Sequence, residues 1–178
     1  MRYKFVDQTA VYVESGKGGP GCVSFRREAN IPRGGPDGGS GGRGGDVVIH
    51  SDPQMATLLD YQFKRRHIAK NGLPGEGRSK SGPDGATLRI PVPVGTSVFD
   101  SDTDELIIDL SKPDSSIVIT KGGRGGKGNV HFKSSTRQAP RFSQPGEPSE
   151  QRNIRLELKL LADVGLIGFP NIGKSSLI

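Results

Sequence analysis

The sequence has no tryptophan, a single cysteine and no long apolar run. Because Cys22 has no second cysteine to pair with, an internal disulfide is impossible and the chain suits a reducing compartment. No apolar run approaches the roughly 18 residues that a membrane helix needs, and residues 1–21 carry no secretory or transit pattern. We therefore expect a cytoplasmic protein without a membrane span.

Aromatic residues make up only 6% of the chain, which argues against stacking of nucleobases on an aromatic platform. The three histidines have no cysteine partner at metal-binding spacing, so the sequence does not indicate zinc: they are His50, His67 and His131. Asp100, Asp102 and Asp104 alternate as at the start of a calcium loop, but Glu105 stands where that loop needs glycine. We interpret this segment as a turn between two strands.

Glycine is abundant instead, with 27 residues, most of which collect in four patches at 16–21, 34–45, 72–85 and 122–128. Between the patches lie short β-branched or alternating apolar runs bounded by Gly, Pro, Asp and Ser, which predict strands. These runs are 11–13, 22–25, 47–50, 88–94, 106–110, 117–120 and 154–160. No helical periodicity precedes Lys174, so we expect a mainly β scaffold with glycine-rich excursions, and Cys22 as a small buried hydrophobe in a strand.

The second patch has two rows of glycines at a spacing of three residues: Gly35, Gly38, Gly41 and Gly44, then Gly39, Gly42 and Gly45. Three residues per turn is the period of the polyproline II helix, and two bare edges would let neighbouring segments approach closely. The patches therefore predict several polyproline II helices packed side by side. Four flexible glycine loops are the alternative, which the three-residue spacing disfavours.

Twenty-five Lys and Arg against 19 Asp and Glu give a net charge of +6, which favours an anionic partner but also fits a soluble basic protein. Lys121, Arg124 and Lys127 would line one edge of a polyproline II helix about 9 Å apart, a spacing that can follow a phosphate backbone. A solvated charged edge is the alternative interpretation. Further basic clusters adjoin turns: Arg26 and Arg27, Lys64 to His67 with Lys70, Arg78 with Lys80, and Lys133, Arg137 and Arg141.

The sequence motif at residues 168–175 matches the phosphate-binding loop G-x-x-x-x-G-K-[ST]. Its residues are Gly168, Phe169, Pro170, Asn171, Ile172, Gly173, Lys174 and Ser175. In such a loop backbone N–H groups surround the phosphates, the lysine reaches the outer phosphates and the hydroxyl holds magnesium. Residues 163–167 predict the strand that enters the loop and 174–178 the first helical turn after it. The further motifs of a working GTPase are not found, so we expect no nucleotide hydrolysis by this chain alone.

Two glycine-rich stretches are distinctive. Residues 22–46 contain Cys-Val-Ser-Phe-Arg-Arg-Glu and Gly-Gly-Pro-Asp-Gly-Gly, and residues 122–129 read Gly-Gly-Arg-Gly-Gly-Lys-Gly-Asn. Together with the phosphate loop, they resemble the Obg family of bacterial GTPases. The resemblance covers nearly all of the chain. It implies an Obg domain at 1–159, with glycine-rich polyproline II helices packed on a small β-barrel, followed at 160–178 by the start of a P-loop α/β GTPase domain, truncated after the phosphate loop.

The resemblance also implies a function in assembly of the large ribosomal subunit and in the response to nutrient stress, with slow GTP hydrolysis. Residues 168–175 would bind GTP and Ser175 would ligate Mg²⁺ in the parent protein, and we expect neither ligand to be held by this chain alone. Tip loops would face ribosomal RNA, and we expect a monomer. The RNA-facing candidates are Arg26, Arg27, Arg33, Arg78, Lys80, Lys121, Arg124, Lys127, Arg137 and Arg141. Two alternatives stay open: a non-enzymatic polyproline II interaction module, and a P-loop ATPase with an unusual leader.

Overall fold

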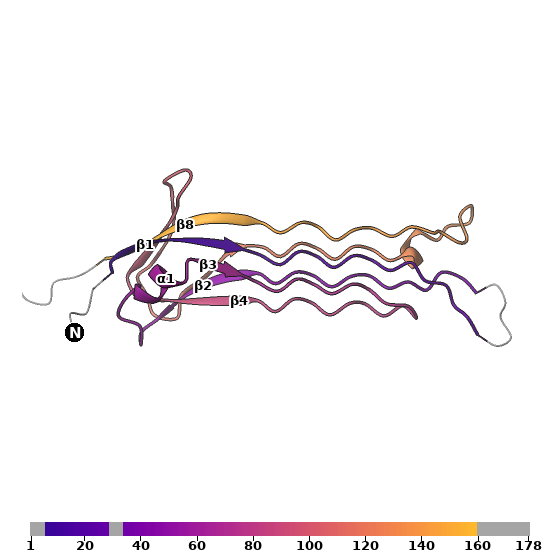
Figure 1. Cartoon of the computed structure of the whole chain (residues 1–178), viewed down its shortest axis with the longest axis horizontal. Coiled ribbons are helices and arrows are strands. Elements are labelled where there is room, and N and C mark those ends of the chain that lie inside the picture. The colour runs from indigo at the N-terminus through magenta and orange to yellow at the C-terminus, as the bar shows by residue number, and fades with distance from the viewer. Residues whose placement is uncertain (1–5, 29–33, 160–178) are drawn as a thin grey trace, which may run out of the picture.

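The computed structural model describes residues 6–28 and 34–159, and it places a β-sheet region at one end of a long glycine-rich shaft (Figure 1). The strands are β1 (Gln8–Glu14), β2 (Val47–Asp52), β3 (Arg66–Ile68), β4 (Leu88–Pro93), β5 (Thr96–Asp100), β6 (Leu106–Leu110), β7 (Ser116–Thr120) and β8 (Gln151–Leu158). Two short helices accompany them: α1 (Leu59–Phe63) and the 3-10 helix η1 (Asn129–Phe132). The prediction of a mainly β chain is therefore confirmed. Arg33 and the predicted phosphate loop at 168–175 lie outside the described residues.

The strands form two sheets that enclose one core. The larger sheet has the order β3-β1-β8-β5-β6, with β1 antiparallel to β8 and parallel to β3. The smaller sheet has the order β4-β2-β7, with β2 parallel to β4 and antiparallel to β7. Where the resemblance implied a small β-barrel, the described strands make two separately hydrogen-bonded sheets.

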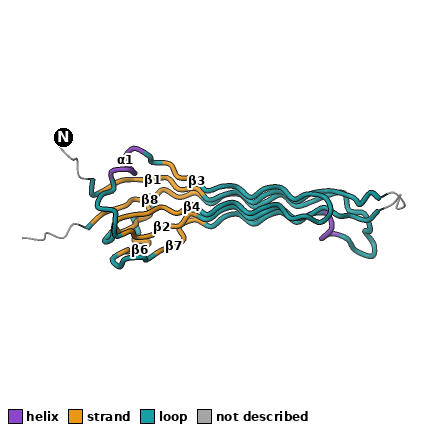
Figure 2. The backbone as a smooth tube through the Cα atoms, turned by 90° about the horizontal axis from the view of Figure 1, so that it is seen from below, coloured by secondary structure: helices purple, strands orange, loops and turns teal. Residues whose placement is uncertain are grey.

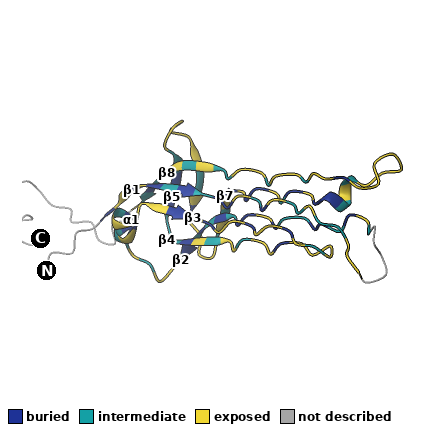
Figure 3. Ribbon diagram, turned by 45° about the vertical axis from the view of Figure 1, so that its right-hand side comes forward, coloured by how far each residue is buried: buried dark blue, intermediate teal, exposed yellow. Residues whose placement is uncertain are grey.

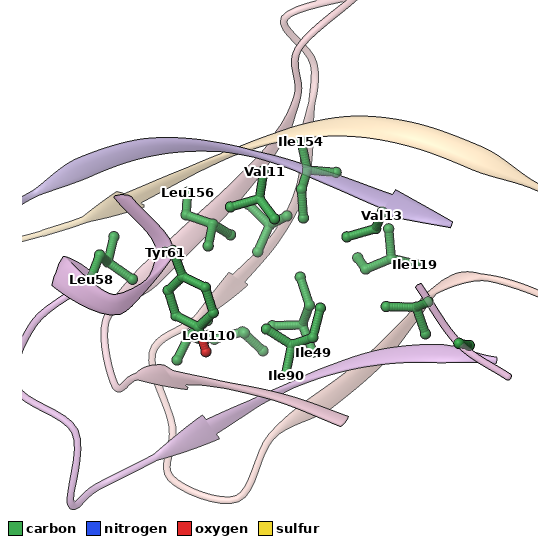
Figure 4. Packing of buried hydrophobic residues seen from close by; sticks show 14 of the residues in the cluster. Val11, Val13, Ile49, Leu58, Tyr61, Ile90, Leu110, Ile119, Ile154 and Leu156 are labelled. Atoms are coloured by element: carbon green, nitrogen blue, oxygen red, sulfur yellow. The ribbon is translucent and has the colours of Figure 1, made fainter. Parts of the chain in front are cut away.

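Alternation of apolar and polar residues along the strands supplies the core between the sheets, as in β2, where every second residue is buried. Val13 and Leu156 of the larger sheet and Ile49 of the smaller sheet are fully buried and point into the space between the two sheets (Figure 4). Each such side chain contributes about 1.5–3 kcal/mol by leaving water. Tyr61 of α1 covers one end of this core, its hydroxyl donates to the Pro91 carbonyl, and burial raises its pKa to about 12.

The strand runs expected at 11–13, 47–50, 88–94, 106–110, 117–120 and 154–160 all coincide with strands of the structure. Asp100 to Asp104 form the predicted turn, because the Asp100 carboxylate accepts a hydrogen bond from the Asp102 N–H at 2.9 Å and Asp104 adopts a left-handed φ of 60° between β5 and β6. The structure adds β3, β5 and α1, which no sequence run predicted. Neither helix of the described part is long and apolar enough to cross a membrane.

The strand predicted at 22–25 is wrong, since this segment belongs to the shaft and makes one isolated bridge, between Phe25 and Pro36. Cys22 is half-buried rather than buried. Its N–H donates to the Gly39 carbonyl and its carbonyl accepts from the Asn129 N–H, so its two bonds go to two different segments instead of one ladder. A β-branched and aromatic run resembles a strand in sequence, but the glycines on either side impose the packing of the shaft.

The shaft consists of six extended segments without strand assignment, at 15–25, 34–46, 70–77, 80–87, 121–129 and 141–150 (Figure 2). Backbone hydrogen bonds join them at every third residue. Between the first two segments, for example, the N–H groups of Gly16, Gly19 and Cys22 donate to the carbonyls of Gly45, Gly42 and Gly39. Segments 15–25 and 34–46 lie at the centre, because each is hydrogen-bonded to four of the others. This arrangement carries three loops to the end remote from the sheets.

Candidate nucleic-acid interface

Glycine permits the close approach of the shaft segments. A Cβ atom at Gly41 would lie 2.0 Å from the carbonyl oxygen of Gly19, a backbone atom that no side-chain rotation can move. The predicted row of Gly38, Gly41 and Gly44 faces segment 15–25, and the row of Gly39, Gly42 and Gly45 faces segment 80–87. Both predicted glycine edges are thus contact surfaces between segments. Gly35 is different, because the nearest atom to a Cβ at this position would be Nζ of Lys133, 3.9 Å away.

Parts of three loops lie at the tip of the shaft: residues 25–28 with Gly34, residues 77–80 and residues 129–141 (Figure 1). Two open clefts lie between them, with volumes of about 1050 and 1180 Å³. Residues of all three loops line the smaller cleft, among them Arg27, Arg78 and Lys133. Loops that are far apart in the sequence therefore combine into one surface.

Most of the predicted RNA-facing residues gather at this tip and are exposed (Figure 3). Arg26, Arg27 and Arg78 line the smaller cleft, and Arg141 lines the larger one. Lys133 lines both clefts. Lys80 and Arg137 are exposed at the ends of the second and third loops. The contact of these residues with RNA stays a prediction.

Arg26 is already engaged with an acidic neighbour within its loop. Its Nε and Nη2 atoms lie 2.8 and 2.9 Å from the two carboxylate oxygens of Glu28. The guanidinium lowers the pKa of the Glu28 carboxyl, and the carboxylate raises the pKa of Arg26. Both side chains are about half exposed, so the pair is screened by solvent. Arg26 is consequently less available to a phosphate than Arg27 or Arg78.

The predicted basic edge of Lys121, Arg124 and Lys127 lies along the side of the shaft, on the segment that leads to η1. All three residues are exposed, while the glycines between them are mostly buried. Two acidic side chains border this edge. The Glu150 carboxylate accepts a hydrogen bond from the backbone N–H of Lys121 at 2.8 Å, and the Glu147 carboxylate accepts one from the backbone N–H of Arg124 at 3.0 Å. The edge is therefore less basic than its sequence alone suggests.

Asn129 anchors the tip to the shaft, a role that sequence reasoning missed. Its side chain is fully buried: Oδ1 accepts from the Gly38 N–H at 2.8 Å, and Nδ2 donates to the carbonyls of Ser24 and Pro140 at 2.9 and 3.1 Å. One side-chain amide thus joins segments 15–25 and 34–46 of the shaft to the third loop. The position of Asn129 directly after a glycine patch could have indicated this role. An asparagine side chain both donates and accepts hydrogen bonds, so it can pair with backbone N–H and C=O groups of neighbouring segments.

The third loop and the segment that follows it also bring aromatic side chains together. The ring centroids of Phe132 and Phe142 are 4.8 Å apart, and Cζ of Arg137 lies 5.2 Å from the Phe142 centroid. Within residues 6–28 and 34–159, no group of three or more His, Cys, Asp and Glu side chains is placed to hold a metal ion. The described interface is cationic, polar and aromatic.

A family model described as GTP1/OBG matches residues 6–160, which covers both sheets, the shaft and the tip. The chain belongs to the GTP1/OBG family. The family resemblance drawn from residues 22–46 and 122–129 is thereby confirmed. The Obg signatures are the glycine rows that pack the shaft and the residues that anchor its tip.

Curated relatives agree with this assignment. Proteins named GTPase Obg are 58% identical in Clostridium botulinum, 55% in Desulfovibrio desulfuricans and 54% in Pelodictyon phaeoclathratiforme. Each similarity covers 98% of this chain, but 41%, 48% and 52% of the respective relative. The chain thus spans about half the length of the relatives that it matches.

Proposed function

We propose that this chain is the RNA-binding part of an Obg-family GTPase that acts in assembly of the large ribosomal subunit and in the stress response. The observation that carries the proposal is the tip, where exposed arginines and lysines from three loops converge: Arg26, Arg27, Arg78, Lys80, Lys133, Arg137 and Arg141. Ribosomal RNA is the anionic partner that such a surface fits, since cations on loops carried by a rigid scaffold can follow folded phosphate backbones. We expect a cytoplasmic monomer.

The shaft supports this function by holding the loops at a distance from the sheets. We infer that its six segments are polyproline II helices, since their hydrogen bonds recur with the three-residue period of that helix. Every segment is hydrogen-bonded to at least two others, so the segments that carry the loops cannot shift without breaking these bonds. A scaffold that is ordered before binding loses little entropy on binding, which favours a tight complex with folded RNA.

The nucleotide chemistry belongs to the sequence from residue 160 onward, which we propose as the start of the GTPase domain, with 1–159 as the Obg domain. Backbone N–H groups of 168–175 and Lys174 would surround the GTP phosphates, and Ser175 would ligate Mg²⁺. The relatives that carry the name GTPase Obg support guanine nucleotide as the ligand.

The purified 178-residue chain is expected to show no GTP turnover. The full-length protein is expected to hydrolyse GTP slowly and to lose this activity when Lys174 is replaced (Lys174→Ala). GTP hydrolysis by the 178-residue chain alone would contradict the proposal that hydrolysis needs further parts of the GTPase domain.

Binding to purified large ribosomal subunits over a series of salt concentrations tests the RNA-binding proposal. The logarithm of the binding constant should fall linearly with the logarithm of the salt concentration. The double change Lys133→Ala and Arg141→Ala should reduce that slope by about two, since each lost phosphate contact removes about one. Lys64→Ala with Arg65→Ala removes the same charge at the sheet end and serves as the matched control. Equal slopes for the two double variants, or binding that salt does not affect, would refute the role of the tip.

A further inference from the structure

The tip carries a stack of aromatic rings and a guanidinium group that phosphate contacts alone do not require. The rings of Phe132 and Phe142 lie at an interplanar angle of 43° with their centroids 4.8 Å apart, and Arg137 lies over the Phe142 ring. Phe142 is 41% exposed and Arg137 is exposed, so the stack is open to solvent. An aromatic pair whose only role was packing would gain more by being covered, since exposed ring surface forfeits hydrophobic stabilisation.

Hydrogen bonds within the loop, and from the side chain of Asn129, hold the loop that carries this stack. The N–H of Arg137 donates to Oγ of Ser134 at 3.1 Å, and the N–H of Ser134 donates to the Arg137 carbonyl at 3.0 Å, which closes residues 134–137 into a turn. The buried amide of Asn129 donates to the Pro140 carbonyl and fixes the returning chain. The stack is therefore set before any ligand arrives, and binding does not have to order it.

The surroundings of the stack define the ligand that it fits. Lys133 and Arg141, which directly adjoin Phe132 and Phe142 in the chain, line the larger cleft together with Gln138. Phe132, Phe142 and Arg137 are not part of the cleft lining, so the rings and the cleft are two neighbouring features linked by adjacent residues of the chain. A π surface next to cationic residues suits a flat ring on an anionic backbone, which is a nucleotide. In a duplex the faces of the bases are covered by their neighbours, whereas single-stranded RNA presents them for stacking on aromatic or guanidinium groups.

We propose that Phe132, Phe142 and Arg137 form a binding site for one unpaired nucleobase of RNA. Lys133 and Arg141 then hold the adjoining phosphates in the larger cleft. This site rests on the proposed RNA-binding function and adds to it a preference for single-stranded over double-stranded segments. Such a preference would direct the tip to loops and bulges of folded RNA.

A single fluorophore in the stack tests the site directly. Because the chain has no tryptophan, Phe142→Trp introduces a unique one. A short single-stranded RNA is expected to quench its fluorescence on binding, because the base stacks on the indole. An abasic oligomer of the same length keeps the phosphates, and we expect it to bind with the same salt dependence but without quenching. Equal quenching by both oligomers, or binding of the RNA without quenching, overturns the site.

A second variant measures the contribution of stacking. Phe142→Leu keeps an apolar side chain but has no ring, and we expect it to bind the single-stranded RNA about 5- to 100-fold more weakly. Its affinity for the abasic oligomer should not change, and Phe142→Tyr should restore RNA binding. Arg137→Lys keeps the charge but loses the planar group, so affinity should fall with an unchanged salt slope.

The two proposals fail in different ways. If the unaltered chain binds neither oligomer, the RNA-binding function is wrong and the base site falls with it. If the chain binds both oligomers equally well and Phe142→Leu changes neither affinity, RNA binding stands and the base site alone is overturned. Circular dichroism and thermal unfolding of each variant show whether the fold is retained, and the Phe142→Tyr rescue separates lost stacking from lost structure.

Discussion

The sheet region and the shaft are parts of one short chain that are held together by opposite means. Between the sheets, Val13, Ile49 and Leu156 are withdrawn completely from water. Among the described residues, the buried hydrophobic cluster contains no residue of the six shaft segments. The interior of the shaft is mostly glycine, and the contacts between its segments are mostly backbone hydrogen bonds at three-residue intervals.

This difference predicts opposite sensitivity to mutation in the two regions. A core of side chains is damaged when atoms are removed, because a cavity remains. A core of glycine and backbone is damaged when atoms are added, because the neighbouring carbonyls cannot turn away. The same alanine can thus be too small for one end of the molecule and too large for the other.

The largest effect is expected for Gly41→Ala in the centre of the shaft. The added methyl group would lie 2.0 Å from the Gly19 carbonyl oxygen, so segments 15–25 and 34–46 must separate. Their separation breaks several hydrogen bonds at once, and we expect a loss of about 4 kcal/mol or more in the free energy of unfolding. Urea denaturation followed by circular dichroism measures it.

Gly35→Ala is the matched control, because a Cβ at that position would meet nothing closer than 3.9 Å. The same substitution in the same patch should change stability by less than about 1 kcal/mol. Similar losses for the two alanine variants would mean that chain flexibility, and not close packing, explains the glycines of the shaft.

The corresponding change in the sheet region is Leu156→Ala in β8. Leu156 is fully buried, and its removal leaves a cavity between the sheets, for which we expect a loss of about 3 kcal/mol. Leu73→Ala on the shaft removes the same atoms from a residue that is 54% exposed and should cost far less. The denaturant midpoints of the two variants are compared with that of the unaltered chain. Equal losses for Leu156→Ala and Leu73→Ala would contradict the proposal that only the sheet region depends on buried side chains.

The sequence predicted those features of the structure that arise from a repeated pattern. It did not predict features that depend on one contact between distant segments. The spacing of Gly38, Gly41 and Gly44 revealed the close packing of the shaft, because each position in the row has the same surroundings. The basic clusters predicted which loops are cationic, but not that Arg26 is paired with Glu28 or that carboxylates border Lys121. Those facts depend on which segments become neighbours.

The missed elements have the same explanation. The helix α1 has five residues, too few for a periodic pattern, and Tyr61 fixes it against the core. β3 has only three residues and exists because it pairs with β1. The contact between Phe132 and Phe142 joins residues that are ten positions apart, so the low aromatic content gave no indication of it.

Asn129→Ala probes the junction between shaft and tip and should have an intermediate effect. It leaves the Gly38 N–H and the Ser24 and Pro140 carbonyls without their partner, and we expect a loss of roughly 2 kcal/mol. The loss should be local, so that amide hydrogen exchange accelerates at 129–141 but not in β1 or β8. Uniform acceleration throughout the chain would mean that shaft and sheets unfold as one unit.

The smallest effect is a pH dependence that we assign to the sheet region through His67. This residue in β3 is 9% exposed, its ring lies 5.5 Å from that of Tyr61, and burial lowers its pKa below 6.5. The unfolded chain therefore takes up this proton at a higher pH than the folded chain. The stability that neutral His67 contributes is complete above about pH 6.5 and is lost as the pH falls through the folded pKa, with a slope of at most about 1.4 kcal/mol per pH unit.

Free energies of unfolding between pH 7.5 and 5 measure this contribution in two matched variants. His67→Gln should flatten the profile below pH 6.5, even if it lowers stability at every pH. His131→Gln, at the exposed tip, removes the same imidazole far from the core between the sheets and serves as the matched control, for which we expect an unchanged profile. If the tip variant flattened the profile instead, proton uptake would be linked to the shaft, and the view that burial of side chains is confined to the sheet region would have to be given up.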